Sequence, residues 1–236
     1  MATPNGGVSG RRLLLSLVLW VALVAVVGGG TVLALRLLLR PWPAAHAADV
    51  SAVLIAEAYL TLLAALLLAF GGPAGLRDRL RFRFTSAVDI AVALAVWVAA
   101  LVVGGLVTAA LTPLLGQPES NTETLLRRSF DPLFVALIVP TVCVLAPACE
   151  ELLFRGALFG WLARRIPVPI AVVVTAAAFA GAHLLPTLLP VLFVFGLAAT
   201  LVRLRTDSTL NSFAMHATQN TFAVLATYAL LSSGRG

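Results

Sequence analysis

The sequence contains no lysine and few charged residues of any kind. Only 11% of its 236 residues are charged, compared with about 25% in an average soluble domain. Hydrophobic residues make up 61% of the chain, and the mean hydropathy is +1.03. This composition excludes an ordinary soluble domain and indicates an integral membrane protein.

Cysteine is almost as scarce as charge. The two cysteines, Cys143 and Cys149, are six residues apart in an apolar run and do not share a helix face, so we expect no disulfide framework. The net charge of +6 comes from arginines that stand at the ends of apolar runs. In that position arginines set membrane orientation, and we therefore expect no nucleic-acid partner.

Long apolar runs dominate what remains. A spanning helix needs about 20 mostly apolar residues. The candidate spans are 13–35, 50–70, 87–111, 132–162, 168–184, 187–203 and 209–231. They predict an all-α polytopic transmembrane helix bundle with about seven spans, within a range of about six to eight. The fifth and sixth runs are short and joined by a turn with two prolines, so a re-entrant hairpin is the alternative there.

The arginines also predict how the chain is oriented. With the N-terminus inside, the inner face holds ten arginines and the outer face five, which follows the positive-inside rule. We therefore predict a plasma-membrane protein with a cytoplasmic N-terminus, and the composition favours a bacterium. The predicted organisation is a cytoplasmic head at 1–12, three spans over 13–111, an external loop at 112–131, and a C-terminal helix bundle at 132–232.

Charged side chains within the apolar runs point to a functional site. A charge at bilayer depth costs about 2.5–3.5 kcal/mol, so such residues are rare and usually functional. In the stretch EELLFR, Glu151 and Arg155 are four residues apart, in the favourable order for an ion pair on one helix. Glu150 is rotated by about 100° from its neighbour and is not committed to the same arginine.

Two more pairs share the four-residue spacing, and each contains a histidine. They are Phe179 with His183 in FAGAH, and His216 with Asn220 in HATQN. A rise of about 1.5 Å per residue places Glu150, His183 and His216 at nearly the same depth in three different spans. A single shared site is the simplest explanation.

These side chains are sufficient to hydrolyse an amide bond. A carboxylate and an imidazole can hold and deprotonate a water molecule, while a second imidazole and an amide stabilise the oxyanion. A zinc site made of Glu150, His183 and His216 is the alternative, because two histidines and a glutamate form a known zinc set. The sequence contains no HExxH, GxSxG or GxGD motif.

The motifs EExxxR, FxxxH and HxxxN, in that order on successive spans, resemble the CAAX prenyl protease and bacteriocin-processing family (CPBP, also called Abi). The resemblance covers about residues 130–232 and implies an intramembrane endopeptidase. It implies that Glu150 is the base that activates water with His183 beside it, and that His216 and Asn220 stabilise the oxyanion. The residues with an implied structural role are Glu151, Arg155 and Phe179.

Family members have been described both as metalloproteases and as metal-independent glutamic proteases. The resemblance favours the second type, without a cofactor, and leaves zinc open. It implies two partners, the lipid bilayer and a membrane-associated or lipidated protein or peptide substrate. A proton-coupled transporter or a non-catalytic membrane scaffold could use the same buried polar residues. The sequence shows no inverted repeat with matching broken helices, which disfavours a transporter.

Overall fold

The computed structural model describes residues 8–38, 47–117 and 132–233. Within these ranges every regular element is a helix, and no strand is present. The elements are α1 (Gly10–Leu23), η1 (Val24–Gly28), α2 (Gly29–Leu38), α3 (Ala47–Phe70), α4 (Gly72–Asp78), α5 (Ala87–Leu115), α7 (Pro132–Pro140), η3 (Thr141–Leu145), α8 (Ala146–Glu151), η4 (Leu152–Leu158), α9 (Phe159–Leu162), α10 (Val168–Ala182), α11 (Leu189–Thr206) and α12 (Thr209–Ser232). The prediction of an all-α polytopic helix bundle is confirmed.

Helices occupy all seven predicted apolar runs, but they are not equally suited to cross a membrane. Among the described residues, five helical segments are long and apolar enough to do so: Gly10–Leu38, Ala48–Phe70, Ala87–Leu115, Pro132–Leu162 and Leu189–Thr206. The other two predicted spans are α10, a shorter apolar helix of 15 residues, and α12, which is not among the five. The chain is therefore an integral membrane protein with five candidate spans and two further bundle helices.

Three serines mark the first residues of helices. Ser9, Ser86 and Ser208 are the N-caps of α1, α5 and α12, and each hydroxyl accepts a hydrogen bond of 3.0–3.3 Å from a backbone N–H three residues later. Such a bond satisfies one of the free donors at a helix start and is worth about 1 kcal/mol. The caps explain why the apolar runs become helical where they do.

The ends of two predicted regions differ from the structure. Helix α1 begins at Gly10, and Val8 is buried, so the last part of the predicted head at 1–12 packs on the bundle. Helix α5 continues to Leu115 and therefore includes the first residues of the predicted loop at 112–131. Residues 1–7 and 118–131, which make up the rest of the predicted head and loop apart from their described ends, lie outside the described residues.

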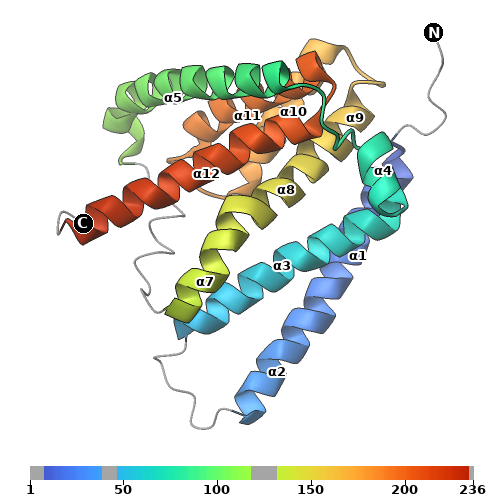
Figure 1. Cartoon of the computed structure of the whole chain (residues 1–236), viewed down its shortest axis with the longest axis vertical. Coiled ribbons are helices and arrows are strands. Elements are labelled where there is room, and N and C mark those ends of the chain that lie inside the picture. Colours follow the sequence, from blue (N-terminus) through green and yellow to red (C-terminus); the bar gives the residue numbers. More distant parts are fainter. Residues whose placement is uncertain (1–7, 39–46, 118–131, 234–236) are drawn as a thin grey trace.

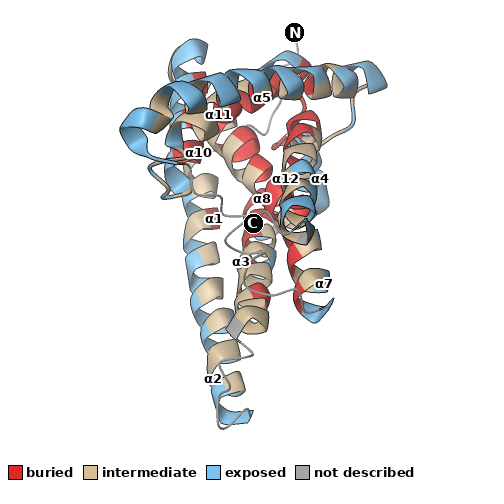
Figure 2. Ribbon diagram, turned by 90° about the vertical axis from the view of Figure 1, so that its left-hand side faces the viewer, coloured by how far each residue is buried: buried red, intermediate tan, exposed pale blue. Residues whose placement is uncertain are grey.

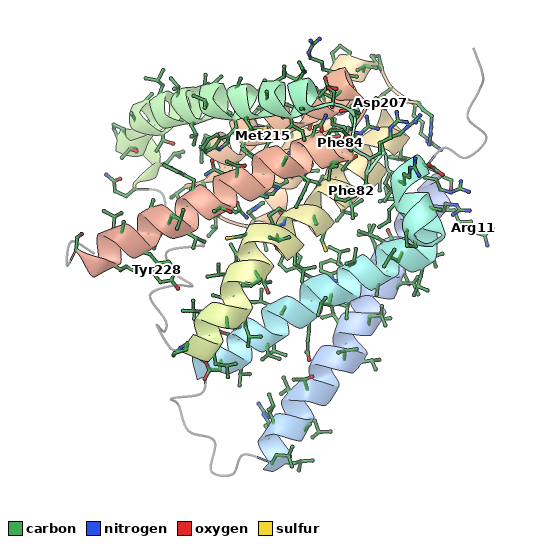
Figure 3. All side chains as sticks on the ribbon, viewed as in Figure 1. Arg11, Phe82, Phe84, Asp207, Met215 and Tyr228 are labelled. Carbon is green, nitrogen blue, oxygen red and sulfur yellow. The ribbon has the colours of Figure 1, made fainter. Side chains whose placement is uncertain are left out.

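Most described helix ends that carry arginine lie at one end of the bundle, at the upper right of Figure 1, whereas the last turn of α2, which carries Arg36, lies at the opposite end. Arg12 at the start of α1 donates to the carbonyl oxygen of Ala69 at the end of α3, at 3.0 Å. Asp207, in the turn between α11 and α12, is labelled at this end in Figure 3. Its carboxylate lies 2.8–3.6 Å from three arginines, Arg81, Arg83 and Arg203. A seven-helix topology requires these ends to share one face, and the cytoplasmic location of that face stays a prediction.

The bundle is buried unevenly, as Figure 2 shows. In the most apolar window of each helix, only 6% of the residues are buried in Gly10–Leu38 and 11% in α5. The corresponding share is 39% in both Pro132–Leu162 and α11. In α3 the share is 33%, so the interior of the molecule lies among Pro132–Leu162, α11 and α3. The α1–α2 segment and α5 present apolar side chains suited to lipid.

Candidate active site

The motif EELLFR lies on a helical segment with an irregular backbone. In Pro132–Leu162, the π-helical turns η3 and η4 flank α8, a six-residue stretch that ends at Glu151. Pro140 precedes η3 and Pro147 lies in the first turn of α8. Proline has no N–H to donate, so it interrupts the backbone ladder of a helix. π-Helical turns are often found at functional sites.

Helix α12 satisfies a carbonyl group that this interruption leaves free. The N–H of Ala146 bonds to the carbonyl of Thr141, five residues earlier, and the next position is Pro147, which has no N–H. The carbonyl of Val142 thus lacks a donor in its own helix, and Asn220 Nδ2 donates to it at 2.9 Å. Asn220 uses one of its two amide hydrogens in this way and keeps the other.

Replacing Asn220 tests this contact between helices. We expect Asn220→Leu to lower the free energy of unfolding by about 1–3 kcal/mol, because a carbonyl inside the bundle loses its donor. The measurement is denaturant or thermal unfolding in detergent micelles. Thr227→Val is a matched control on the same helix, since Thr227 donates only to the carbonyl of Ala223 one turn earlier. Equal stability of the two variants would contradict the assignment.

Glu151 and Arg155 form the ion pair that their spacing predicts. Arg155 Nη1 donates to Glu151 Oε1 at 2.7 Å, and both side chains are fully buried. Arg155 Nη2 reaches the carbonyl oxygen of Gly196 on α11 at 3.2 Å, and the guanidinium lies 4.2 Å from the centre of the Phe179 ring on α10. A Cβ atom at Gly196 would lie 3.0 Å from Ala176, so glycine favours this close approach of α11 to α10. The pair therefore joins three helices.

Glu151 also orients a histidine from α12. His216 Nδ1 lies 3.0 Å from Oε1 of Glu151, the oxygen that also accepts from Arg155. A carboxylate paired with arginine accepts hydrogen bonds and does not donate them, so Nδ1 of His216 carries the hydrogen. In neutral His216 the other ring nitrogen, Nε2, therefore presents a lone pair.

Glu150 has a more open environment than its neighbour. Its side chain is 15% exposed, whereas that of Glu151 is fully buried. Tyr59 Oη, from α3, donates to Glu150 Oε1 at 2.6 Å, and Glu150 Oε2 lies 3.8 Å from His216 Nε2. The last separation is too long for a direct hydrogen bond, but it suits one water molecule about 2.8 Å from each atom.

His183 lies at the C-terminal end of α10 and contacts Phe179 of the same helix. Its Nδ1 bonds to the carbonyl oxygen of Phe179 at 2.9 Å, and the two ring centres are 4.9 Å apart. The Phe179 ring also meets the His216 ring edge-on, with centres 5.7 Å apart. Since the carbonyl can only accept, neutral His183 also has its lone pair on Nε2. The imidazole that faces Glu150 directly is that of His216, whereas the sequence analysis placed His183 beside Glu150.

The zinc set considered from the sequence does not form a ligand cluster here. In the described parts of the chain, no group of three His, Cys, Asp or Glu side chains is arranged to hold a metal ion. Glu150 and His216 are close, but His183 is not grouped with them. No step below is routed through a metal.

Tyr59 is the member of the group that sequence reasoning missed. It lies in the apolar run LIAEAYL, in which Glu57 is the only charged residue. A tyrosine in a membrane span is ordinary, and its partner is 91 residues later in the chain. The one available signal was its position near the middle of a span, at a depth comparable with that of Glu150.

A comparison with known families now complements this geometry. The family model described as type II CAAX prenyl endopeptidase Rce1-like matches residues 132–222. This segment is similar to the Rce1-like family. The resemblance inferred from the three motifs is thereby confirmed for residues 132–222, and the match indicates a membrane-embedded endopeptidase. No curated protein and no solved structure matches the chain. The Rce1-like segment includes the residues from Glu150 to Asn220 but not α3, which provides Tyr59.

Proposed function

We propose that this protein is a metal-independent intramembrane endopeptidase in which Glu150 and His216 activate a water molecule. The observation that carries the proposal is the 3.8 Å gap between Glu150 Oε2 and His216 Nε2. Both atoms are acceptors when Glu150 is ionised and His216 is neutral. A water in the gap would direct its two hydrogens at these atoms and turn its lone pairs towards a substrate.

The reaction needs one proton acceptor that later becomes a donor. Glu150 takes a proton from the water as the oxygen attacks the carbonyl carbon of the substrate, forming a C–O bond and a tetrahedral oxyanion. Protonated Glu150 then gives the proton to the leaving nitrogen as the C–N bond breaks. The products are an amine and a carboxylic acid. Glu151 supports the step indirectly, because it fixes the hydrogen of His216 on Nδ1.

Two residues remain candidates for stabilising the oxyanion. Asn220 follows His216 by four residues on α12 and has a second amide hydrogen besides the one bound by Val142. A protonated His183 would also donate from Nε2, since only its Nδ1 is held by the backbone. Preorganised donors of this kind stabilise the charge that develops in the transition state.

The substrate class follows from the family description and from the location of the site. The Rce1-like family is named for CAAX prenyl endopeptidases, so a peptide with a prenylated cysteine near its C-terminus is the first substrate to test. A peptide anchored by a lipid is also delivered to the depth at which membrane-embedded catalytic groups lie.

Cleavage by the purified protein in lipid nanodiscs tests the proposal. A fluorogenic prenylated peptide should be cut, and the same peptide without its lipid should be cut more slowly. Treatment with EDTA or 1,10-phenanthroline should leave the rate unchanged. If the chelators abolish cleavage and zinc restores it, metal independence is wrong. If neither peptide is cut and proteoliposomes instead take up a solute in response to a pH gradient, the endopeptidase proposal is wrong and the transporter alternative replaces it.

A further inference from the structure

Helix α3 lies outside the Rce1-like segment, but it contacts the site at two consecutive residues of α8. The phenol of Tyr59 donates to Glu150 Oε1 at 2.6 Å. The backbone carbonyl oxygen of the same tyrosine accepts a hydrogen bond from Cys149 Sγ at 3.3 Å. Tyr59 is therefore tied to α8 through both its side chain and its backbone, which fixes the register between the two helices at this point.

Helix α1 supports α3 from the opposite direction. Trp20 Nε1 on α1 donates to the carbonyl oxygen of Ala58 at 2.9 Å, directly before Tyr59. Apolar side chains from these helices form one core cluster, in which Leu62 and Leu66 of α3 lie with Cys149 and Leu152. The helices run side by side in Figures 1 and 2, with α3 next to α1 and α8. The part of α3 that carries Tyr59 is thus held by α8 and by α1.

We propose that Tyr59 is a positioning residue for Glu150, and that the N-terminal spans serve catalysis by supplying it. The inference rests on the function proposed above. By holding Oε1, the tyrosine turns Oε2 of the same carboxylate towards Nε2 of His216. Tyr59 acts through Glu150 and does not itself contact the reacting atoms.

A carboxylate on a flexible side chain needs such a restraint. The two oxygens of a glutamate are chemically equivalent, and the side chain has three rotatable bonds, so Glu150 alone has no preference for the productive orientation. Its neighbour Glu151 is restrained by Arg155 and His216, but these groups leave Glu150 unheld. A hydrogen bond from a phenol to a carboxylate is charge-assisted and short, and it is strong enough to select one orientation. Small displacements of a reacting group have large effects on rate.

Tyr59→Phe tests the role, because it removes the donor and keeps the ring. We expect kcat for the prenylated peptide to fall by about 10- to 100-fold, which corresponds to loss of one hydrogen bond to a charged group. KM should stay within about twofold, since the tyrosine does not touch the substrate. Thermal unfolding of the variant in micelles should match that of the wild type to within a few degrees.

Tyr228→Phe is the matched control, since Tyr228 is the other tyrosine in the sequence. It lies towards the C-terminal end of α12, as Figure 3 shows, and packs in a different core cluster from Cys149. This variant should keep the wild-type kcat and KM. A Tyr59→Phe protein with wild-type kcat would overturn the proposal, as would a rise in KM alone or an equal loss of kcat in Tyr228→Phe.

The outcome for Glu150 separates this proposal from the one on which it rests. If Glu150→Gln is inactive and Tyr59→Phe is fully active, the endopeptidase stands and the positioning role of Tyr59 is wrong. If Glu150→Gln cleaves at the wild-type rate, the proposed function is wrong whatever the result at Tyr59.

Discussion

Glu150→Gln is expected to lower kcat for peptide cleavage by about 10²–10⁴-fold, which is the usual contribution of a general base. The change removes a charge and keeps the shape of the side chain, and the amide oxygen can still accept a hydrogen bond from Tyr59. The protein should therefore remain folded and inserted. Cleavage assays and unfolding curves recorded on the same preparation check both parts of the expectation.

Glu57→Gln provides the matched control for this variant. Glu57 is also a glutamate within an apolar helix, and its Oε1 accepts a hydrogen bond from Thr31 at 2.7 Å, on α2. It is not part of the group around Glu150. The control should retain wild-type activity, and a comparable loss in both variants would mean that any carboxylate lost from the membrane region inactivates the protein.

Arg155→Met is expected to cause the largest loss of stability, about 3–5 kcal/mol. The variant leaves the fully buried carboxylate of Glu151 without its arginine, and an unpaired charge in such a place is far more costly than an intact pair. It also removes the donor to Gly196 and the contact with the Phe179 ring. The folded fraction after detergent extraction, followed by denaturant titration, measures the effect.

An exposed arginine nearby supplies the control for this change. Arg165 lies just beyond α9, where it donates to the carbonyl oxygen of Trp161 at 3.1 Å and lies 4.7 Å from the Trp161 ring. Because such surface contacts contribute little, Arg165→Met should change the free energy of unfolding by less than about 1 kcal/mol. If Arg155→Met were equally mild, the buried pair would not hold the helices together.

A double variant separates the stability of the pair from its role in the reaction. Replacing a buried ion pair by apolar side chains of similar size is often neutral for stability, so Glu151→Leu/Arg155→Met should recover most of the lost stability. The same protein should remain inactive, because His216 loses the acceptor that fixes its Nδ1 hydrogen. Recovery of stability and activity together would show that Glu151 has no part in orienting His216.

The sequence was most informative where the geometry is local. The pairing of Glu151 with Arg155 depends only on the helical repeat, and the distance of 2.7 Å agrees with it. Counting helical rise also placed Glu150 and His216 at a common depth, and their side chains do approach to 3.8 Å. The length and apolarity of the runs were enough to identify an all-helical membrane bundle.

Contacts that depend on how helices rotate against one another could not be read from the sequence. Which side chain meets Glu151 on α12 depends on the packing of that helix, so its bond to His216 was not expected. The resemblance implied that Asn220 stabilises the oxyanion, and no sequence signal showed which carbonyl it would meet; in the structure it donates to the carbonyl of Val142, which Pro147 leaves without a donor. Nothing in a single apolar run indicates that a tyrosine there will meet a glutamate from a distant span.

The two π-helical turns on either side of α8 mean that residue count is part of the site. A π turn holds one residue more than an α turn closed by the equivalent hydrogen bond. Removing one residue from η3 or η4 would let that turn close as an α turn, so the flanking helix would keep its facing and only the bulge would be lost. Removing one residue from α8, which has no extra residue, would rotate the flanking helix by about 100°, the angle that separates Glu150 from Glu151 around the axis, and would exchange the roles of neighbouring side chains.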